Sequence, residues 1–256
     1  MLATQSERTA RRDARRLSLT DVSVEFGGVS AVDSVSISCR SGVVSGLIGP
    51  NGAGKTTVIN AITGFAPVAS GSIHSDDHEL TNQPIRAIVG EGVIRTFQGA
   101  RIFSELSVFE NVVLGGLGCG KSAPQAENDA LDALGRLRVP SNLFSRRGAE
   151  LPAGLQRKVA FARALCAEPA ILLLDEPCAG LIDVESADVQ QTIRDLAEEH
   201  GLGVLLIEHD MEVVMSVCDE IHVLNHGEII ASGTPDEVRN DPAVIEAYLG
   251  RGNADA

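Results

Sequence analysis

Apolar and polar residues recur along this chain with the periods of strands and helices. Residues 17–26 and 32–39 alternate apolar and polar side chains on either side of a Gly27-Gly28 turn. This period of two predicts two strands with one buried face each. Three short runs are mainly apolar instead, at 43–48, 171–174 and 203–207. Continuous apolar runs of this length are typical of strands that are buried on both faces of a parallel sheet.

Other segments carry apolar residues at helical spacing or in further extended runs. The predicted helices cover residues 57–62, 126–137, 155–166, 185–199 and 243–249. More strands are predicted at 71–74, where we expect a sheet edge, at 93–98, and in a hairpin of 221–224 and 228–231. Thr234-Pro235-Asp236-Glu237 matches a capping box, which predicts that a helix begins there. Strands that alternate with helices predict an α/β fold with a mostly parallel sheet and a ligand site at the carboxyl ends of its strands.

Two segments differ in character from the rest. Residues 99–147 hold apolar side chains at helical spacing, a loose Gly/Ser/Pro-rich stretch at 115–124 and then a helical run. This composition predicts a helical subdomain inserted into the sheet domain. Residues 1–16 hold five arginines and few apolar side chains, so we interpret them as a basic, disordered arm. Contact with anionic lipid headgroups or with a partner protein is the alternative.

The composition narrows the class of protein. Apolar residues make up 44% of the 256 residues and aromatic residues only 3%, so we expect an aliphatic interior. The net charge of −14 opposes binding to nucleic acid. The five cysteines are scattered without a CxxC pair, and we expect them to be buried apolar residues of a reducing compartment. No apolar stretch is long enough to cross a bilayer and no signal-like segment begins the chain, so we expect a cytoplasmic protein that reaches a membrane only through a partner.

A candidate phosphate site lies between the first mainly apolar run and the helix that follows it. The sequence there is Gly49-Pro50-Asn51-Gly52-Ala53-Gly54-Lys55-Thr56-Thr57, which fits the phosphate-loop pattern. Its glycines allow backbone angles that turn successive N–H groups toward phosphate oxygens, and the helix dipole favours the same anion. Lys55 adds a positive charge for the β- and γ-phosphates, and the Thr56 hydroxyl can ligate Mg²⁺. The alternative, a purely structural glycine turn, explains neither the lysine nor the flanking strand and helix.

Polar side chains follow two of the other apolar runs. Asp175 ends the run at 171–174, and Glu176 comes next. One carboxylate suits Mg²⁺, so we assign Asp175 to the metal and Glu176 to the base that orients or deprotonates water. His209 follows the run at 203–207, where its imidazole can donate a hydrogen bond to a γ-phosphate oxygen. A capping Asp-Glu pair and a solvated or core histidine are the structural alternatives.

The order of these motifs along the chain resembles the order in the nucleotide-binding subunits of ABC transporters. The resemblance covers residues from Leu17 onward and includes Gln98 at the Q-loop position and 151–157 at the signature position. Four stretches are similar to the branch that imports branched-chain amino acids, amides and urea, namely 26–28, 95–98, 207–211 and 244–250. The resemblance implies a P-loop, RecA-like fold, with a mostly parallel sheet, an antiparallel β edge and an inserted α-helical subdomain. Residues 17–256 would then form one nucleotide-binding domain, with a core in 17–98 and 168–235, a helical subdomain in 99–167 and a helical tail in 236–256.

The same resemblance implies ligands and partners. Two ATPase subunits would clamp two MgATP between them and drive an integral-membrane permease from the cytoplasmic face of the membrane, with an extracytoplasmic solute-binding protein acting indirectly. Gln98 would sense the nucleotide, help to hold Mg²⁺ and lie on the permease side. Phe26 would stack on adenine, although an aromatic residue that ends a strand also packs in a core. Pro152, Ala153 and Gly154 would complete the ATP site of the partner.

The chain departs from the family pattern in three ways, one of which is a helical subdomain that is shorter than expected for this branch. Proline stands at position 152, where the signature usually has serine, and Ile182 stands where Asp or Asn is usual. Because proline has neither a hydroxyl nor an N–H, we expect a heterodimer with two unequal ATP sites. Two other functions stay open: a soluble ABC protein that acts on ribosomes, DNA or cluster assembly, and a regulatory subunit that hydrolyses ATP poorly.

Lys55→Ala is expected to abolish tight ATP binding, whereas Glu176→Gln is expected to leave binding intact and to stop turnover. Lys55 would contact phosphates in the ground state, whereas the base matters chiefly once water attacks. Calorimetric ATP binding and steady-state phosphate release measure the two effects separately. Hydrolysis at the wild-type rate by Glu176→Gln protein would contradict the assignment of the base.

Overall fold

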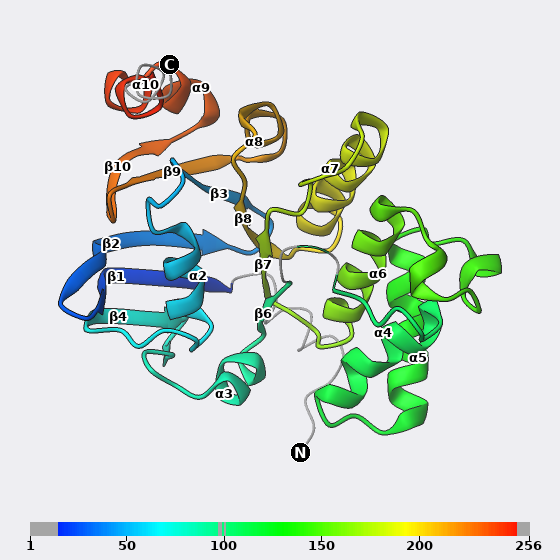
Figure 1. Ribbon diagram of the computed structural model, residues 1–256. Helices are drawn as coiled ribbons and strands as arrows, with labels where there is room; N and C mark the ends of the chain where they lie inside the picture. Colours follow the sequence, from blue (N-terminus) through cyan, green and yellow to red (C-terminus); the bar gives the residue numbers. More distant parts are fainter. Residues whose placement is uncertain (1–14, 97–98, 100, 250–256) are drawn as a thin grey trace.

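The computed structural model describes residues 15–96, 99 and 101–249, which form an α/β structure of two sheets and several helices (Figure 1). The strands are β1 (Arg16–Phe26), β2 (Val29–Arg40), β3 (Val44–Ile48), β4 (Ser70–Ser75), β5 (His78–Glu79), β6 (Val93–Arg95), β7 (Ile171–Asp175), β8 (Gly203–Ile207), β9 (Glu220–Asn225) and β10 (Glu228–Gly233). The helices are α2 (Lys55–Ile62), α3 (Ile85–Gly90), α4 (Val108–Gly118), α5 (Ala123–Arg136), α6 (Ala153–Leu165), α7 (Asp183–Glu198), α8 (Met211–Val217), α9 (Pro235–Arg239) and α10 (Pro242–Leu249). Two 3₁₀ turns, Ser141–Leu143 and Gly148–Glu150, precede α6.

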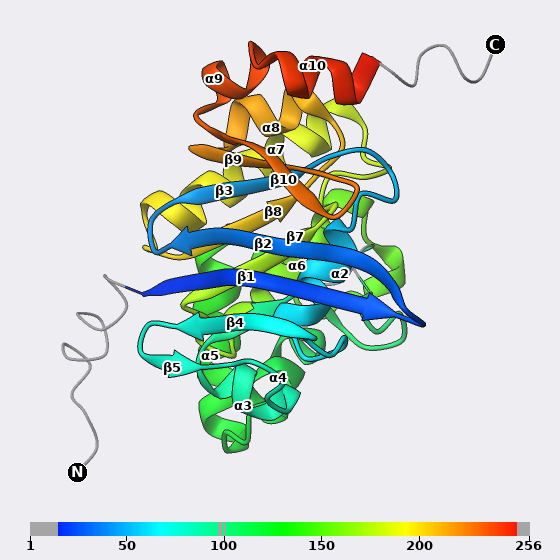
Figure 2. The same ribbon diagram turned by 90° about the vertical axis from the view of Figure 1, so that its left-hand side faces the viewer.

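One sheet is parallel except at its last strand, and the other is antiparallel. The six-stranded sheet has the order β10-β9-β3-β8-β7-β6, and only the β9–β10 pair is antiparallel. The four-stranded sheet has the order β2-β1-β4-β5 with antiparallel pairing throughout. Figure 2 looks onto β2, β1 and β4, which lie side by side in that order. The predicted fold class, a mostly parallel sheet with antiparallel strands and a group of helices, is confirmed.

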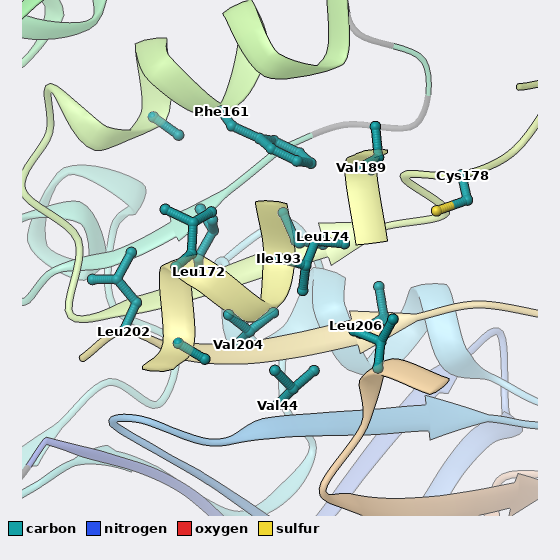
Figure 3. Close-up of a cluster of buried hydrophobic side chains, with 14 of the residues drawn as sticks. Val44, Phe161, Leu172, Leu174, Cys178, Val189, Ile193, Leu202, Val204 and Leu206 are labelled. Carbon is teal, nitrogen blue, oxygen red and sulfur yellow. The ribbon is translucent and has the colours of Figure 1, made fainter. Parts of the chain in front are cut away.

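Both faces of the parallel sheet are covered. All five residues of β3, β7 and β8 are buried. Alternate side chains enter two different cores: Leu172 and Leu206 join one, and Leu173 and Leu205 join the other. The first core packs against α6 and α7 through Phe161 and other apolar residues (Figure 3). The second core packs against α2 and the antiparallel sheet, so the two layers hold the carboxyl ends of the parallel strands fixed between them.

Three predicted elements differ from the structure. The strand at 71–74 is β4, which lies between β1 and β5, so the edge of that sheet is the two-residue β5. The strand predicted at 93–98 ends at Arg95 as β6, and residues 97 and 98 lie outside the described part. The stretch 115–124 is not loose, because it completes α4 and begins α5. A Cβ on Gly116 would lie 2.8 Å from the Ala126 Cβ, so the small residues there let the two helices pack closely.

Two compositional expectations are also corrected. Cys39, Cys166, Cys178 and Cys218 are buried and unpaired as expected, but Cys119 is exposed at the end of α4. The basic arm was expected to extend through residue 16, yet Arg15 already forms ion pairs with Asp76 at 3.3 Å and Glu91 at 3.4 Å, and Arg16 begins β1. The rest of the arm, residues 1–14, lies outside the described residues.

Within the described residues, no helix is both long enough and apolar enough to span a bilayer.

Phe161→Ala is expected to lower the free energy of unfolding by about 3–5 kcal/mol, because Phe161 is 1% exposed and fills the core between α6 and the sheet. Phe103→Ala is the matched control: the same atoms are removed at a side chain that is 52% exposed, and we expect a loss below about 1 kcal/mol. Urea unfolding of both variants measures the difference. Equal losses would contradict the position assigned to the core.

Candidate functional site

Two glycines shape the loop between β3 and α2. Gly49 has φ 150° and Gly54 has φ 110°, both in the region that side-chain-bearing residues rarely adopt. A Cβ on Gly49 would lie 1.9 Å from the carbonyl oxygen of Leu224, and one on Gly54 would lie 2.6 Å from that of Ala31. The loop therefore needs glycine at both positions, because the backbones of β9 and β2 press against it.

Lys55 lies inside this loop. It is the first residue of α2 and only 8% exposed. Its Nζ donates hydrogen bonds to the carbonyl oxygens of Gly49 at 2.7 Å and Pro50 at 3.0 Å. Gly54 is the N-cap of α2, and no side chain of the described residues caps the helix there. The loop thus combines an ammonium group with backbone N–H groups at a helix N-terminus, an arrangement that favours a phosphate.

The loop borders a hollow of about 460 Å³. Seven predicted site residues line it: Asn51, Gly52, Gly54, Lys55, Thr56, Thr57 and Glu176. Five further residues line it that sequence reasoning did not assign to the site: Val29, Ser30, Ala31, Ile207 and His226. Among the predicted loop residues, Gly49 and Ala53 do not line the hollow, and Ala53 is buried behind it.

The additional lining residues come from distant segments. Val29, Ser30 and Ala31 begin β2, and His226 lies in the turn between β9 and β10. That turn is attached to the phosphate loop, because Gly227 N donates to Ala53 O at 2.9 Å. The sequence pattern predicts the hairpin in which residues 225–227 form the turn. Their position beside the hollow follows from the pairing of β9 with β3, which no local pattern reveals.

Asp175 is paired with an arginine. Arg95 Nη2 lies 2.7 Å from Asp175 Oδ2, and each side chain is 9% exposed. Arg95 Nη1 also donates to Asn60 Oδ1 of α2 at 2.6 Å. Asp175 is not among the residues that line the hollow. This arginine therefore joins the carboxylate at the end of β7 to the helix that follows the phosphate loop.

Glu176 and His209 lie together at the ends of neighbouring strands. Glu176 has φ 47°, and its N–H donates to the carbonyl oxygen of Ile207 at 2.9 Å. His209 Nδ1 lies 3.7 Å from Glu176 Oε1, and the imidazole is 58% exposed. Because β7 and β8 are paired in parallel, both side chains emerge at the same edge of the sheet.

The remaining predicted site residues lie elsewhere. Phe26 is 51% exposed, so it does not pack in the core, and it does not line the hollow, although its strand partner Val29 does. Pro152 is the N-cap of α6, and Ala153 is the first residue of that helix. The N–H of Gly154 donates to Glu185 Oε1 at 3.1 Å, a carboxylate from α7. Gln98 lies outside the described residues.

The two predicted Mg²⁺ ligands with described positions carry oxygen donors, and one of them, Thr56, lines the hollow. Thr56 offers a hydroxyl and Asp175 a carboxylate, and both are oxygen ligands of the kind that Mg²⁺ prefers. No group of three or more His, Cys, Asp or Glu residues in the described part could hold a metal by itself. Mg²⁺ commonly keeps its waters and takes phosphate oxygens as ligands, so two protein oxygens fit this ion.

Comparisons with known proteins identify the family that the chain resembles. Residues 32–179 match the model of the family described as "ABC transporter", and residues 228–254 match "Branched-chain amino acid ATP-binding cassette transporter". The chain is 40% identical over 248 residues to the high-affinity branched-chain amino acid transport ATP-binding proteins LivG of Salmonella typhimurium and BraF of Pseudomonas aeruginosa, covering 91% of this chain and 97% of each relative. A solved ATP-binding cassette of an ABC transporter in its ADP conformation is similar with a TM-score of 0.84 and 32% identity, over 93% of this chain and 99% of that one.

Arg95→Met is expected to lower the free energy of unfolding by about 3–5 kcal/mol, because it leaves the buried Asp175 carboxylate without its cation. Arg147→Met is the control: Arg147 lies 3.4 Å from Glu105, but the two side chains are 65% and 82% exposed. We expect its cost to stay below about 1 kcal/mol. Urea unfolding at neutral pH measures both, and equal costs would contradict the assignment of a buried pair.

Proposed function

The chain belongs to the ABC transporter family, and we propose that it is the ATP-hydrolysing subunit of an importer for branched-chain amino acids or related small amides. The observation that carries the solute class is the match of residues 228–254 to the branched-chain amino acid cassettes, beyond the general cassette match at 32–179. The similarity to LivG and BraF along almost their whole length supports the same class.

When ATP binds, Lys55 would leave its hydrogen-bond partners within the protein and contact phosphates instead. Lys55 Nζ is held by the carbonyl oxygens of Gly49 and Pro50, and would turn to the β- and γ-phosphates. The first residues of α2 line the same hollow, and the N-terminus of a helix favours the same anion. Phe26 would stack on adenine, a role supported by its 51% exposed ring and by its strand partner Val29, which lines the hollow.

Thr56 and Asp175 would hold Mg²⁺ together with the phosphates. When bound, the ion supplies positive charge that neutralises the oxygens of the β- and γ-phosphates. Arg95 donates to the Asp175 carboxylate and holds it at the end of β7. The other hydrogen bond of Arg95, to Asn60, fixes the arginine relative to α2. Arg95 and helix α2 thereby connect the Asp175 carboxylate to Thr56, which lies in the same helix as Asn60.

Glu176 would orient or deprotonate the attacking water. It lines the hollow at the end of β7, and its backbone conformation is held by the bond to Ile207. His209, 3.7 Å from Glu176, would donate a hydrogen bond to the γ-phosphate as charge develops there. Gln98 completes this proposal as the nucleotide sensor, on the resemblance of 95–98 alone.

The exposed side chain of Phe103 supports a permease surface beside the helices α4 and α6. Phe103 is 52% exposed, and the guanidinium of Arg163 lies over its ring at 5.6 Å from the centroid. Ile102 is half-buried close by, against Gly148. An apolar ring held at the surface suits a helix of an integral-membrane partner. The subunit would then be peripheral, at the cytoplasmic face of the membrane, and would reach the extracytoplasmic solute-binding protein only through the permease.

The N-terminus of α6 supports a heterodimer with unequal sites. In such dimers the signature of one subunit completes the ATP site of the other, and here Pro152 offers neither a hydroxyl nor an N–H. The next donor, Gly154 N–H, is bonded to Glu185 of the same chain. A lost hydrogen bond to a charged group costs about 1.5–3 kcal/mol, or one to two decades in occupancy or rate. The site built on Lys55 and Glu176 of this chain would be the competent one, provided that the partner has an intact signature.

The function is tested by purifying the tagged full chain from detergent-solubilised membranes. We expect it to co-purify with a multi-span permease and a second ATPase subunit, and to hydrolyse ATP with uptake of leucine into proteoliposomes that contain the binding protein. Recovery without any membrane protein would favour a soluble ABC ATPase instead. Intact assembly without ATP turnover would favour a regulatory subunit.

A separate prediction concerns the two sites. The Glu→Gln base substitution in this chain, Glu176→Gln, is expected to remove nearly all steady-state hydrolysis of the complex, because it disables the competent site. The equivalent substitution in the second ATPase subunit is expected to remove little. Phosphate release from the two variant complexes measures the difference, and equal losses would contradict the asymmetry.

A further inference from the structure

Glu208 is a buried carboxylate for which the proposed mechanism has no role. It follows β8 directly and is only 1% exposed. A carboxylate in the interior is costly unless donors compensate it. Burial raises the pKa of Glu208, and hydrogen bonds from the backbone of Cys178 and His209 act in the opposite direction. Such a residue occupies its place at a cost in stability, which calls for a reason beyond packing.

The two oxygens of Glu208 bind two different loops. Cys178 N–H donates to Oε1 at 2.9 Å, and His209 N–H donates to Oε2 at 3.3 Å. The imidazole Nδ1 of His209 also lies 3.8 Å from Oε2. In Figure 3, Cys178 lies in the loop that follows β7, and Leu206 lies near the end of β8. One carboxylate therefore fastens the loop after β7 to the residue that follows β8.

The loop fastened in this way carries the base. Glu176 N–H is bonded to Ile207 O, Pro177 has no N–H, and Cys178 N–H is bonded to Glu208. The N–H groups of Glu176 and Cys178 thus donate to two consecutive residues at the end of β8. Glu176 has the left-handed φ of 47°, a conformation that persists only where the surroundings impose it.

We propose, on the basis of the function proposed above, that Glu208 is a positioning residue that holds Glu176 and His209 in register around the γ-phosphate. Glu208 is not among the residues that line the hollow. It acts by holding two backbone amides, that of Cys178, which is two residues after the base, and that of His209. A displacement of about 1 Å in such a group lowers the rate about 100-fold while leaving ground-state contacts intact.

Glu208→Gln tests the proposal in the full chain, purified with its co-purifying subunits. The amide keeps the volume and one acceptor, but its NH₂ group then faces one of the two backbone N–H donors. We expect kcat to fall about 10- to 100-fold, with the Kd for ATP within about threefold of wild type. Glu208→Asp restores both acceptors on a shorter stem, and we expect it to recover part of the lost kcat.

Glu220→Gln is the matched control. Glu220 begins β9 of the same sheet, and its carboxylate accepts a hydrogen bond from Ser45 Oγ at 2.7 Å. Its side chain is 25% exposed and does not line the hollow. We expect its kcat and Kd to match wild type. A wild-type kcat in Glu208→Gln would overturn the positioning role, and so would losses of ATP affinity and thermal stability large enough to account for the lower rate. Wild-type protein assayed in parallel separates the proposals, because an inactive wild type overturns the proposed function rather than the role of Glu208.

Discussion

Burial of the strands β3, β7 and β8 on both faces is the constraint from which the site follows. Every residue of these strands is out of solvent, and parallel pairing places their carboxyl ends at one edge. Polar side chains are excluded from such strands unless they are paired, so they appear where each strand stops. The loop with Lys55, the carboxylate of Glu176 and the imidazole of His209 follow those strand ends. The aliphatic interior thereby determines where the chemistry can lie.

Three polar groups assigned to the site have hydrogen-bond partners within the protein itself. Lys55 is bonded to loop carbonyls, Asp175 to Arg95, and the Gly154 amide to Glu185. These internal partners remove the cost of burying unpaired polar groups when no ligand is bound. The net affinity for a ligand is then the difference between two sets of contacts rather than the sum of the new ones. A bound nucleotide would therefore compete with these internal contacts rather than simply add to them.

Short-range signals predicted the parts of the site that lie within a few residues of one another. Glycine, lysine and hydroxyl spacing located the phosphate loop, and the capping box at Thr234 located the start of α9. The contributions of Ala31, His226 and Glu208 were missed, because each depends on contacts between segments far apart in the sequence. The stretch 115–124 has the composition of a loop, yet its small residues serve the close packing of α4 on α5. Tertiary packing there overrides local propensity.

The attachment of the hairpin turn to the phosphate loop has a consequence for biosynthesis. Gly227 donates to Ala53 O and accepts from Asp33 N, and the carbonyl of Leu224 presses on Gly49. A nascent chain therefore carries the whole phosphate-loop sequence long before it carries the segment that supports it. Contacts between residues so far apart in the sequence form late in folding, because closing the intervening chain costs entropy before these contacts stabilise the fold. ATP can therefore stabilise the loop in this form only after residues 224–227 have joined the chain and packed against it.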